Sequence, residues 1–534
     1  MAPDKRIKIK RPSIMTTKLP QLPDEVLCLI FLAVVQEEPR SPWKNTRAQA
    51  PWNVSAVCRV WRRVALDSAR LWTRFQVGFG IGYPPRCKNK SEFCLSQRHT
   101  IRCMYQLQRS GSMPISVDMW DMQCQCMESM VRLLAGHVER WEVLRLRPTD
   151  SMSYDNLRDF TPSKIHFASL RHLEYECDAE QDICLGHHFD VSVLPSLTSF
   201  QIVRWDGTEN KSVGSSLPKP REARFAWTRL TRVYLQDYRG HAGSILSFLK
   251  GSPVLASFRI SAVRDCTRQM HPPVNVQDHP HDSIILAHLV HLDIEVNDEA
   301  NTTGCFCPLS ILPVIRTPGL SELVLTGLGM RYLYEPQPNA DLSELVLRSQ
   351  CLIRTLQLSI SWGYPDDPED ANPYPSFLQQ LTAVQSLRLT LPDEPYTPDD
   401  CAPVLRHMLR TEDTAAELFP NLQRLHLAQH RFDPCLLLQV IQSRNDRLWP
   451  KKGGNTQRLD TVEVDFRNAP LGSYGVKRVE DVVRHYAAVL ETGLEICGMP
   501  EGFRLTFDPD KFVPFQRLTG EFGDQLASEE GEDE

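Results

Sequence analysis

One cysteine of this 534-residue chain lies among basic residues, a setting in which a thiol can become a nucleophile. Cys58 stands within residues 55–72, and arginines occupy three of the next five positions. Neighbouring positive charge lowers the pKa of a thiol and favours the reactive thiolate. Cys58 also falls on an apolar stripe with Val57 and Trp61, at helical spacing. We therefore predict that Cys58 packs as a small hydrophobic side chain within an interface.

Two pairs of adjacent carboxylates are the other candidates for chemistry, as acid–base groups. Asp366 with Asp367, and Asp399 with Asp400, lie in proline-rich segments and have no histidine or basic residue next to them. Carboxylates in such loops are ordinarily solvated. The sequence contains no HExxH, GxSxG, Walker or kinase-type motif. We predict that the chain is not an enzyme.

Metal and phosphate ligands are also poorly arranged in the sequence. The 16 cysteines include no CxxC pair, and structural zinc sites need closely paired ligands. The GFGIG segment at residues 78–82 lacks the continuation of a phosphate-binding loop, and prolines follow where a helix must begin. We expect no cofactor and no metal, even at the nearest clusters: Cys124 with Cys126, Cys305 with Cys307, and His271, His279 and His281.

Composition limits the classes of partner. A formal net charge of −6 with 24% charged residues does not indicate nucleic acid or an anionic membrane as the main partner. No apolar run reaches the length of about 20 residues that spans a bilayer. The first residues lack the apolar stretch of a secretory signal, so we expect an intracellular protein, cytoplasmic or nuclear, with reduced thiols.

The segment that carries Cys58 is predicted to pair with an earlier helix. Leu22 and Pro23 open that earlier helix, with acidic residues near the positive end of its dipole. It is apolar on nearly every side, whereas a hairpin of about fifty residues is too small to bury both faces. We infer that one face forms the core and the other docks on a protein partner. The apolar residues are Val26, Leu27, Leu29, Ile30, Phe31, Leu32, Ala33 and Val34.

Four fragments in this order and spacing resemble the F-box of the large fungal F-box family: LPDEVLCLIF, PW at residues 51–52, VCRVW and LW at residues 71–72. The resemblance covers residues 19–77, and its departure from the family is the long insertion at residues 36–50. It implies a three-helix element that binds the Skp adaptor of an SCF-type, cullin-based ubiquitin ligase. Aspartate at Leu27 and Ile30 is then expected to abolish capture of the adaptor. The implied adaptor-binding residues are Leu22, Pro23, Leu27, Ile30, Phe31, Val57, Cys58 and Trp61.

A repeat follows the helices. The pattern apolar-x-x-apolar-x-apolar occurs eleven times, at intervals of 25 to 38 residues. Helix-compatible stretches separate the copies, so each unit predicts one short strand and a returning helix or irregular turn. The pattern resembles leucine-rich repeats over residues 113–510, although no regular Asn or Cys follows each strand. The copies end at Leu146, Tyr175, Ile202, Leu235, Ile260, Ile294, Leu325, Leu358, Leu389, Leu427 and Val464.

The predicted fold class is therefore α/β: a three-helix F-box followed by an irregular leucine-rich-repeat-like solenoid with a parallel sheet. The basic N-terminal segment is either a nuclear import signal or a solvated tail, and the acidic C-terminal segment is expected to be disordered. Loops at residues 264–283 and 363–375 are expected to project from the repeats. The predicted regions are a basic tail (1–18), the F-box (19–77), a linker and helix (78–112), the repeats (113–510) and an acidic tail (511–534).

Residues that alternate with the apolar positions of the repeat strands should line the exposed face of the sheet. That face is mixed in charge and is our leading candidate for binding an unidentified target protein. The leading hypothesis is a substrate-recognition subunit of an SCF-type ligase, which binds the Skp adaptor through the F-box and the target through the repeats. The alternatives are a non-catalytic protein-binding scaffold without ligase recruitment and, third, an enzyme of unfamiliar type.

Overall fold

The structure is a computed structural model whose described residues divide into two compact units, Met1–Glu142 and Val143–Glu534. The tails, the GFGIG segment, the insertion beyond Glu37, both predicted loops, the two aspartate pairs and the cysteine and histidine clusters lie wholly or almost wholly outside the described residues. The described residues are 22–37, 51–77, 95–120, 128–147, 167–176, 194–203, 227–238, 242–264, 283–298, 308–329, 336–361, 376–390, 402–409, 418–428, 434–445, 458–465, 488, 490 and 504–507.

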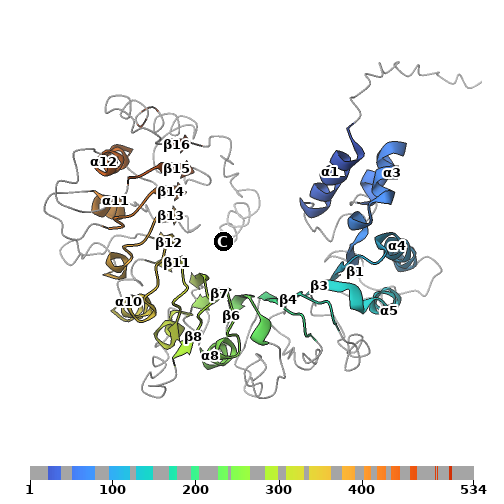
Figure 1. The fold of residues 1–534 in the computed structure, drawn as a ribbon, viewed down its shortest axis with the longest axis horizontal. Coiled ribbons are helices and arrows are strands. Elements are labelled where there is room, and N and C mark those ends of the chain that lie inside the picture. The colour runs from blue at the N-terminus through green and yellow to red at the C-terminus, as the bar shows by residue number, and fades with distance from the viewer. Residues whose placement is uncertain are drawn as a thin grey trace, which may run out of the picture. The chain divides into compact units, whose positions relative to one another are not determined.

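The first unit combines helices with two short strands (Figure 1). Strand β1 pairs with β2 in parallel, with Phe75 opposite Val117. Helix α4 stops at Gly111, which adopts the left-handed φ of +55° that glycine tolerates best. The elements are α1 (Asp24–Glu37), α2 (Trp52–Val57), α3 (Arg59–Asp67), η1 (Ala69–Trp72), β1 (Arg74–Val77), α4 (Leu95–Ser110), β2 (Ile115–Trp120), α5 (Glu128–Ala135) and η3 (Val138–Arg140).

The helical spacing of Val57, Cys58 and Trp61 does not correspond to one continuous helix. Helix α2 ends at Val57, Cys58 is extended at φ −152° and ψ 175°, and α3 begins at Arg59. A second interruption at Ser68 separates α3 from the 3-10 helix η1. The extended backbone at Cys58 permits its side chain to cap α3, a role that helical periodicity alone does not reveal.

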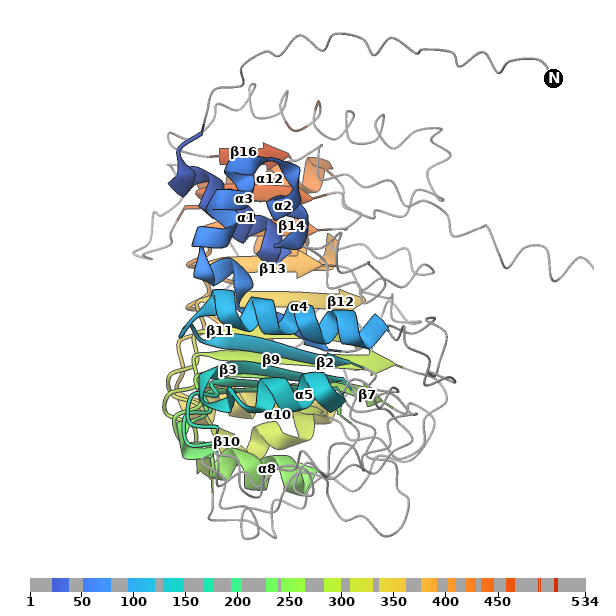
Figure 2. The same ribbon diagram turned by 90° about the vertical axis from the view of Figure 1, so that its right-hand side faces the viewer.

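Parallel strands form the framework of the second unit. They belong to a 14-stranded sheet with the order β1-β2-β3-β4-β5-β6-β7-β9-β11-β12-β13-β14-β15-β16. Figure 2 shows β9 and β13 as arrows that point the same way. The strands are β3 (Trp141–Arg147), β4 (His172–Glu176), β5 (Ser199–Val203), β6 (Arg232–Tyr238), β7 (Ser257–Arg264), β9 (His291–Asp298), β11 (Glu322–Gly329), β12 (Thr355–Ser361), β13 (Ser386–Thr390), β14 (Arg424–Ala428), β15 (Thr461–Asp465) and β16 (Arg504–Phe507).

The structure confirms a long parallel sheet built from the predicted strands, and it shows their register. Each of the eleven repeated patterns lies on a strand, and the last apolar residue of each lies opposite the last apolar residue of the next. The series runs from Leu146 opposite Tyr175 to Leu427 opposite Val464, and Val464 then lies opposite Phe507 of β16. Register follows the apolar pattern because a slip of one residue would turn the buried side chains toward solvent.

Helices cover one face of these strands. In Figure 1, α8, α10, α11 and α12 all lie on the same side of the strands. The apolar residues of the repeated strand patterns are buried. Two very short strands, β8 and β10, pair with each other in a separate sheet. They were not predicted from the sequence. The remaining elements are α8 (Ala242–Lys250), α10 (Pro336–Ser349), α11 (Ala402–Met408), α12 (Pro434–Asn445), η5 (Trp227–Arg229), η7 (Pro308–Val314), η8 (Ser376–Gln380), β8 (Ile284–Ile285) and β10 (Ile315–Arg316).

A bulge interrupts β11 between Thr326 and Leu328. Gly327, the residue between them, has φ +71°, and a Cβ built on it would lie 2.0 Å from the carbonyl oxygen of Val296 on β9. Only glycine fits this close approach between neighbouring backbones.

None of the helices within the described ranges is long and apolar enough to cross a membrane.

Candidate functional site

The three N-terminal helices have a core of their own. Eight buried side chains form it: Leu27, Phe31, Val35, Val54, Val64, Ala65, Leu71 and Trp72. Two aromatic contacts close it, since the Phe31 and Trp61 rings lie 4.9 Å apart and the Trp52 and Trp72 rings meet edge-on at the same distance. The indole nitrogen of Trp72 donates to the carbonyl of Ala65 at 2.6 Å.

This core includes two residues of the predicted docking set, Leu27 and Phe31. Leu27 is 5% exposed and Phe31 is fully buried, so neither side chain is on the surface that a partner would contact. Both lie on the face of α1 that packs against α3, where Phe31 meets Trp61. Aspartate at Leu27 would therefore break the hairpin from within, and it is not a selective probe of docking.

The opposite face of α1 carries an apolar stripe that the described residues leave exposed. We call Val26, Leu29, Ile30 and Val34 the α1 stripe. Their spacing places them along one side of the helix, and Leu29 and Ile30 are 65% and 41% exposed. Monomeric proteins rarely expose neighbouring large apolar side chains unless a partner covers them.

The remaining predicted residues divide by position. Leu22 and Pro23 are exposed immediately before α1, and the Pro23 carbonyl accepts the Leu27 amide at 3.0 Å. Val57, at the end of α2, is 62% exposed, and Trp61 is half-buried against Phe31. Val26, Leu29 and Val34 are not among the predicted docking residues, although their helical spacing is visible in the sequence.

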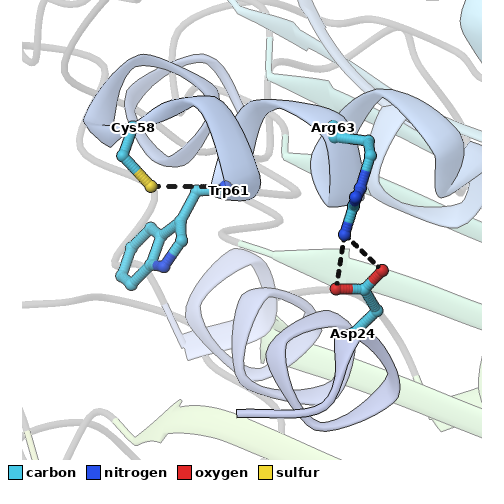
Figure 3. Close-up of polar contacts among 4 residues, drawn as sticks. All are labelled: Asp24, Cys58, Trp61 and Arg63. Carbon is cyan, nitrogen blue, oxygen red and sulfur yellow. Dashed lines mark hydrogen bonds and ion pairs between the residues drawn. The ribbon is translucent and has the colours of Figure 1, made fainter. Parts of the chain in front are cut away.

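Cys58, which was predicted to pack within a protein interface, is exposed in the structure. It is the N-cap of α3, and its sulfur accepts the backbone amide of Trp61 at 3.5 Å (Figure 3). The guanidinium of Arg62 reaches back to the carbonyl of Ser55 at 3.0 Å. The thiol therefore helps to end α2 and begin α3, and the junction turns Val57 outward.

An ion pair joins α1 to α3 on the surface. Arg63 Nη2 donates to both carboxylate oxygens of Asp24, at 2.8 and 3.0 Å (Figure 3). Both side chains are more than half exposed, so the pair contributes only about 0.2–1 kcal/mol. The ion pair joins the first turn of α1 to α3.

Helix α4 holds the hairpin to the rest of the first unit. The guanidinium of Arg109 lies 4.4 Å from the Trp72 ring centroid and 5.2 Å from that of Trp52. Burial lowers the pKa of Arg109, and the nearby Tyr105 partly offsets this effect. Arg140 secures the end of the same helix, donating to Ser110 Oγ at 2.6 Å and to the Met113 carbonyl at 2.9 Å. The α1 stripe is therefore presented by a braced helical unit.

The second candidate surface is the polar face of the second unit, which we define as the side chains that alternate with the buried apolar residues of β3–β16. Predicted members of this face are not all exposed. Six are buried there: Glu174, Ser261, Asp293, Val324, Ser359 and Ala428.

Most charges on the polar face are paired across neighbouring strands. Arg145 Nε lies 2.8 Å from Glu174 Oε2, and His291 Nδ1 lies 3.1 Å from Glu322 Oε2. Such cross-strand pairs stabilise a sheet and leave little net charge for a partner.

Arg259 is the centre of a charge cluster on this face. It lies 3.1 Å from both Asp293 and Glu295, and its guanidinium stacks 4.5 Å from the Tyr234 ring centroid. Burial opposes the Arg259 charge, but Asp293, Tyr234 and Glu295 outweigh burial and raise its pKa. Burial also raises the pKa of Asp293, and Arg259 offsets this only in part. The cluster is satisfied within the chain, apart from Asp293 Oδ1, which is buried and has no hydrogen-bond partner.

The described ranges contain no group of three or more His, Cys, Asp or Glu residues arranged to hold a metal ion. No protein-family model matches the chain, and no curated protein is significantly similar to it. The arrangement of its surfaces is therefore the basis for a functional assignment.

Proposed function

We propose that the chain is a substrate-recognition subunit of an SCF-type ubiquitin ligase, in which the α1–α3 hairpin is a divergent F-box that binds the Skp adaptor. The observation that carries this proposal is the exposed α1 stripe on a hairpin whose core is already filled. An apolar surface beside a complete core is expected to be covered by another protein. The F-box resemblance of these residues supplies the identity of that protein.

The proposed adaptor surface differs in its residues from the one that the resemblance implies. It consists of the α1 stripe with Leu22, Pro23 and Val57, whereas Leu27 and Phe31 support it from inside. Trp61 contributes mainly through its ring contact with Phe31, and Cys58 through the cap of α3.

For the second unit, the proposed role is target capture by a divergent leucine-rich-repeat solenoid. Its strands pair in chain order, and the described helices lie on one face only, which leaves the polar face as a continuous platform. Extended parallel-stranded arrays supply large preformed surfaces of this kind. The chain would carry out no chemistry itself; it would raise the concentration of the target beside the conjugating machinery.

A pull-down with purified Skp adaptor tests the proposal. The unmutated full-length chain should retain the adaptor, and Leu29→Asp with Ile30→Asp should abolish retention because two carboxylates would be buried in an apolar contact. Both positions are exposed in the free chain, so the double variant should keep its fold.

The matched control is Leu347→Asp, an equally exposed leucine on α10 in the second unit. It should bind the adaptor as well as the unmutated chain does. Failure of the unmutated chain to bind, or equal binding by the Leu29 and Ile30 double variant, would reject the adaptor-binding role. The non-recruiting scaffold would then be the better description.

A further inference from the structure

We propose that the polar face over β12, β13 and β14 binds an acidic segment of the target protein, with Arg388 and Arg424 as the residues that recognise its carboxylates. This inference rests on the proposed role of the polar face in target capture. It specifies that the partner is acidic. The paired charges elsewhere on the polar face do not indicate the charge of a partner.

Nine polar-face positions on these three strands contain no carboxylate. The strands are in register, so that Gln357, Arg388 and His426 lie side by side. Arg388 is the central position of this set. The nine are Thr355, Gln357, Ser359, Ser386, Arg388, Thr390, Arg424, His426 and Ala428.

Arg388 differs from the other arginines at the same position of a strand. Arg145 and Arg259 each contact carboxylates within the chain, at 2.8 and 3.1 Å. Among the described residues, Arg388 has no ion pair, and its Nε is buried without a hydrogen-bond partner. A half-buried guanidinium without a counter-charge is costly, so an anion supplied from outside would stabilise it.

Arg424 adds a second positive charge at a useful distance. It is exposed on β14, two residues before His426, and it too forms no ion pair with a described residue. Strand spacing and rise place its Cα about 8 Å from that of Arg388. Carboxylates two residues apart on an extended segment are separated by roughly 7 Å, which matches the two arginines.

The neighbouring strands limit how far an anionic partner can extend. On one side, Glu322 lies on β11, and Asp293 and Glu295 lie beside Arg259 on the next strand, β9. On the other side, Glu463 of β15 lies 3.6 Å from His426. A long polyanion such as RNA would be repelled there. The nine positions also include no Phe, Tyr or Trp on which bases could stack. A short acidic protein segment fits this charge distribution better than a nucleic acid does.

Fluorescence anisotropy with the full-length chain provides the test. The probe is a fluorescein-labelled ten-residue peptide with Glu at every second position, and its matched control has Gln in place of each Glu. The Glu peptide should bind and the Gln peptide should not. Affinity should fall about tenfold in the double variant Arg388→Gln with Arg424→Gln, because two charge-assisted contacts are lost.

Arg232→Gln is the matched control variant. Arg232 is an exposed arginine of β6 at the same strand position as Arg424, about 30 Å away along the sheet and beyond the range of screened charge. The Arg232→Gln variant should bind the Glu peptide with the same affinity as the unmutated chain. Three outcomes would overturn the inference: no binding of the Glu peptide, equal loss in both variants, or tighter binding of a single-stranded oligonucleotide of equal charge. Adaptor capture by the Arg388 and Arg424 double variant, measured in the same preparations, reports separately on the ligase role.

Discussion

Arg444 offers the sharpest test of how the second unit holds its helices in place. This arginine is fully buried near the end of α12. Its guanidinium donates to three backbone carbonyls, those of Met408 at 3.0 Å, Phe419 at 2.9 Å and Leu418 at 2.6 Å. One side chain therefore joins α11, α12 and the turn before β14. Arg444→Met keeps the apolar stem and leaves all three carbonyls without this donor.

The expected cost follows from those three carbonyls. Each buried acceptor left unsatisfied costs about 1–3 kcal/mol, so the local free energy of unfolding should fall by at least about 3 kcal/mol. Hydrogen exchange measured by mass spectrometry on the full-length chain should then show amides of α11 and α12 exchanging roughly a hundredfold faster. Arg444→Lys should be intermediate, since an ammonium on a shorter stem cannot serve all three carbonyls.

The control for this prediction is Arg406→Met, a change of the same type at an exposed position of α11. It should leave exchange in both helices within a factor of about two of the unmutated chain, as surface substitutions usually do. If Arg444→Met exchanges no faster than Arg406→Met, the guanidinium does not support this region and the reasoning is refuted.

Two further predictions concern single positions. Gly327→Ala should lower the melting temperature because its Cβ would collide with the Val296 carbonyl and its φ of +71° is unfavourable for alanine, a cost of about 1–3 kcal/mol; an unchanged melting temperature would contradict the β11 bulge. Iodoacetamide at about pH 8 should modify Cys58 well before Cys103, because burial raises the pKa of the Cys103 thiol to about 12 and keeps it protonated. Mass spectrometry of timed samples would show this order, and equal rates would argue against the buried position of Cys103.

The strands could be predicted because their signal is local. An apolar-x-apolar alternation fixes which side chains are buried, and a one-residue slip would expose them, so the pattern also fixed the pairing of Leu325 with Leu358 and its counterparts. The short strands β8 and β10 have two residues each, too few for any alternation to appear.

The two faces of α1 could not be told apart from sequence. One face places Leu27, Phe31 and Val35 at helical spacing, and the other places Val26 and Ile30 at the same spacing. Only the position of Trp61 and Val64 on α3 decides which face is buried, and that is a tertiary fact. The break between α2 and α3 at Cys58 could not be predicted either, because no glycine or proline lies there to indicate the end of a helix.

On the polar face, the alternation of the strands predicts which residues lie there, but it does not predict how their charges pair. Arg145, Arg259 and Arg388 occupy the same position of the repeated sequence pattern. They differ in the residue that lies opposite each of them on a neighbouring strand. Register supplies a carboxylate beside the first two and a glutamine and a histidine beside the third.

The order of pairing in the second unit has a consequence for how the protein is made. Each long strand bonds to the long strands just before and after it in the chain, so every addition closes a loop of only 25 to 43 residues. A nascent polypeptide can therefore add one strand at a time to an existing edge while the ribosome is still translating. Until the next strand arrives, that growing edge exposes unpaired amides and carbonyls, which makes a stalled or truncated chain a natural candidate for chaperone binding.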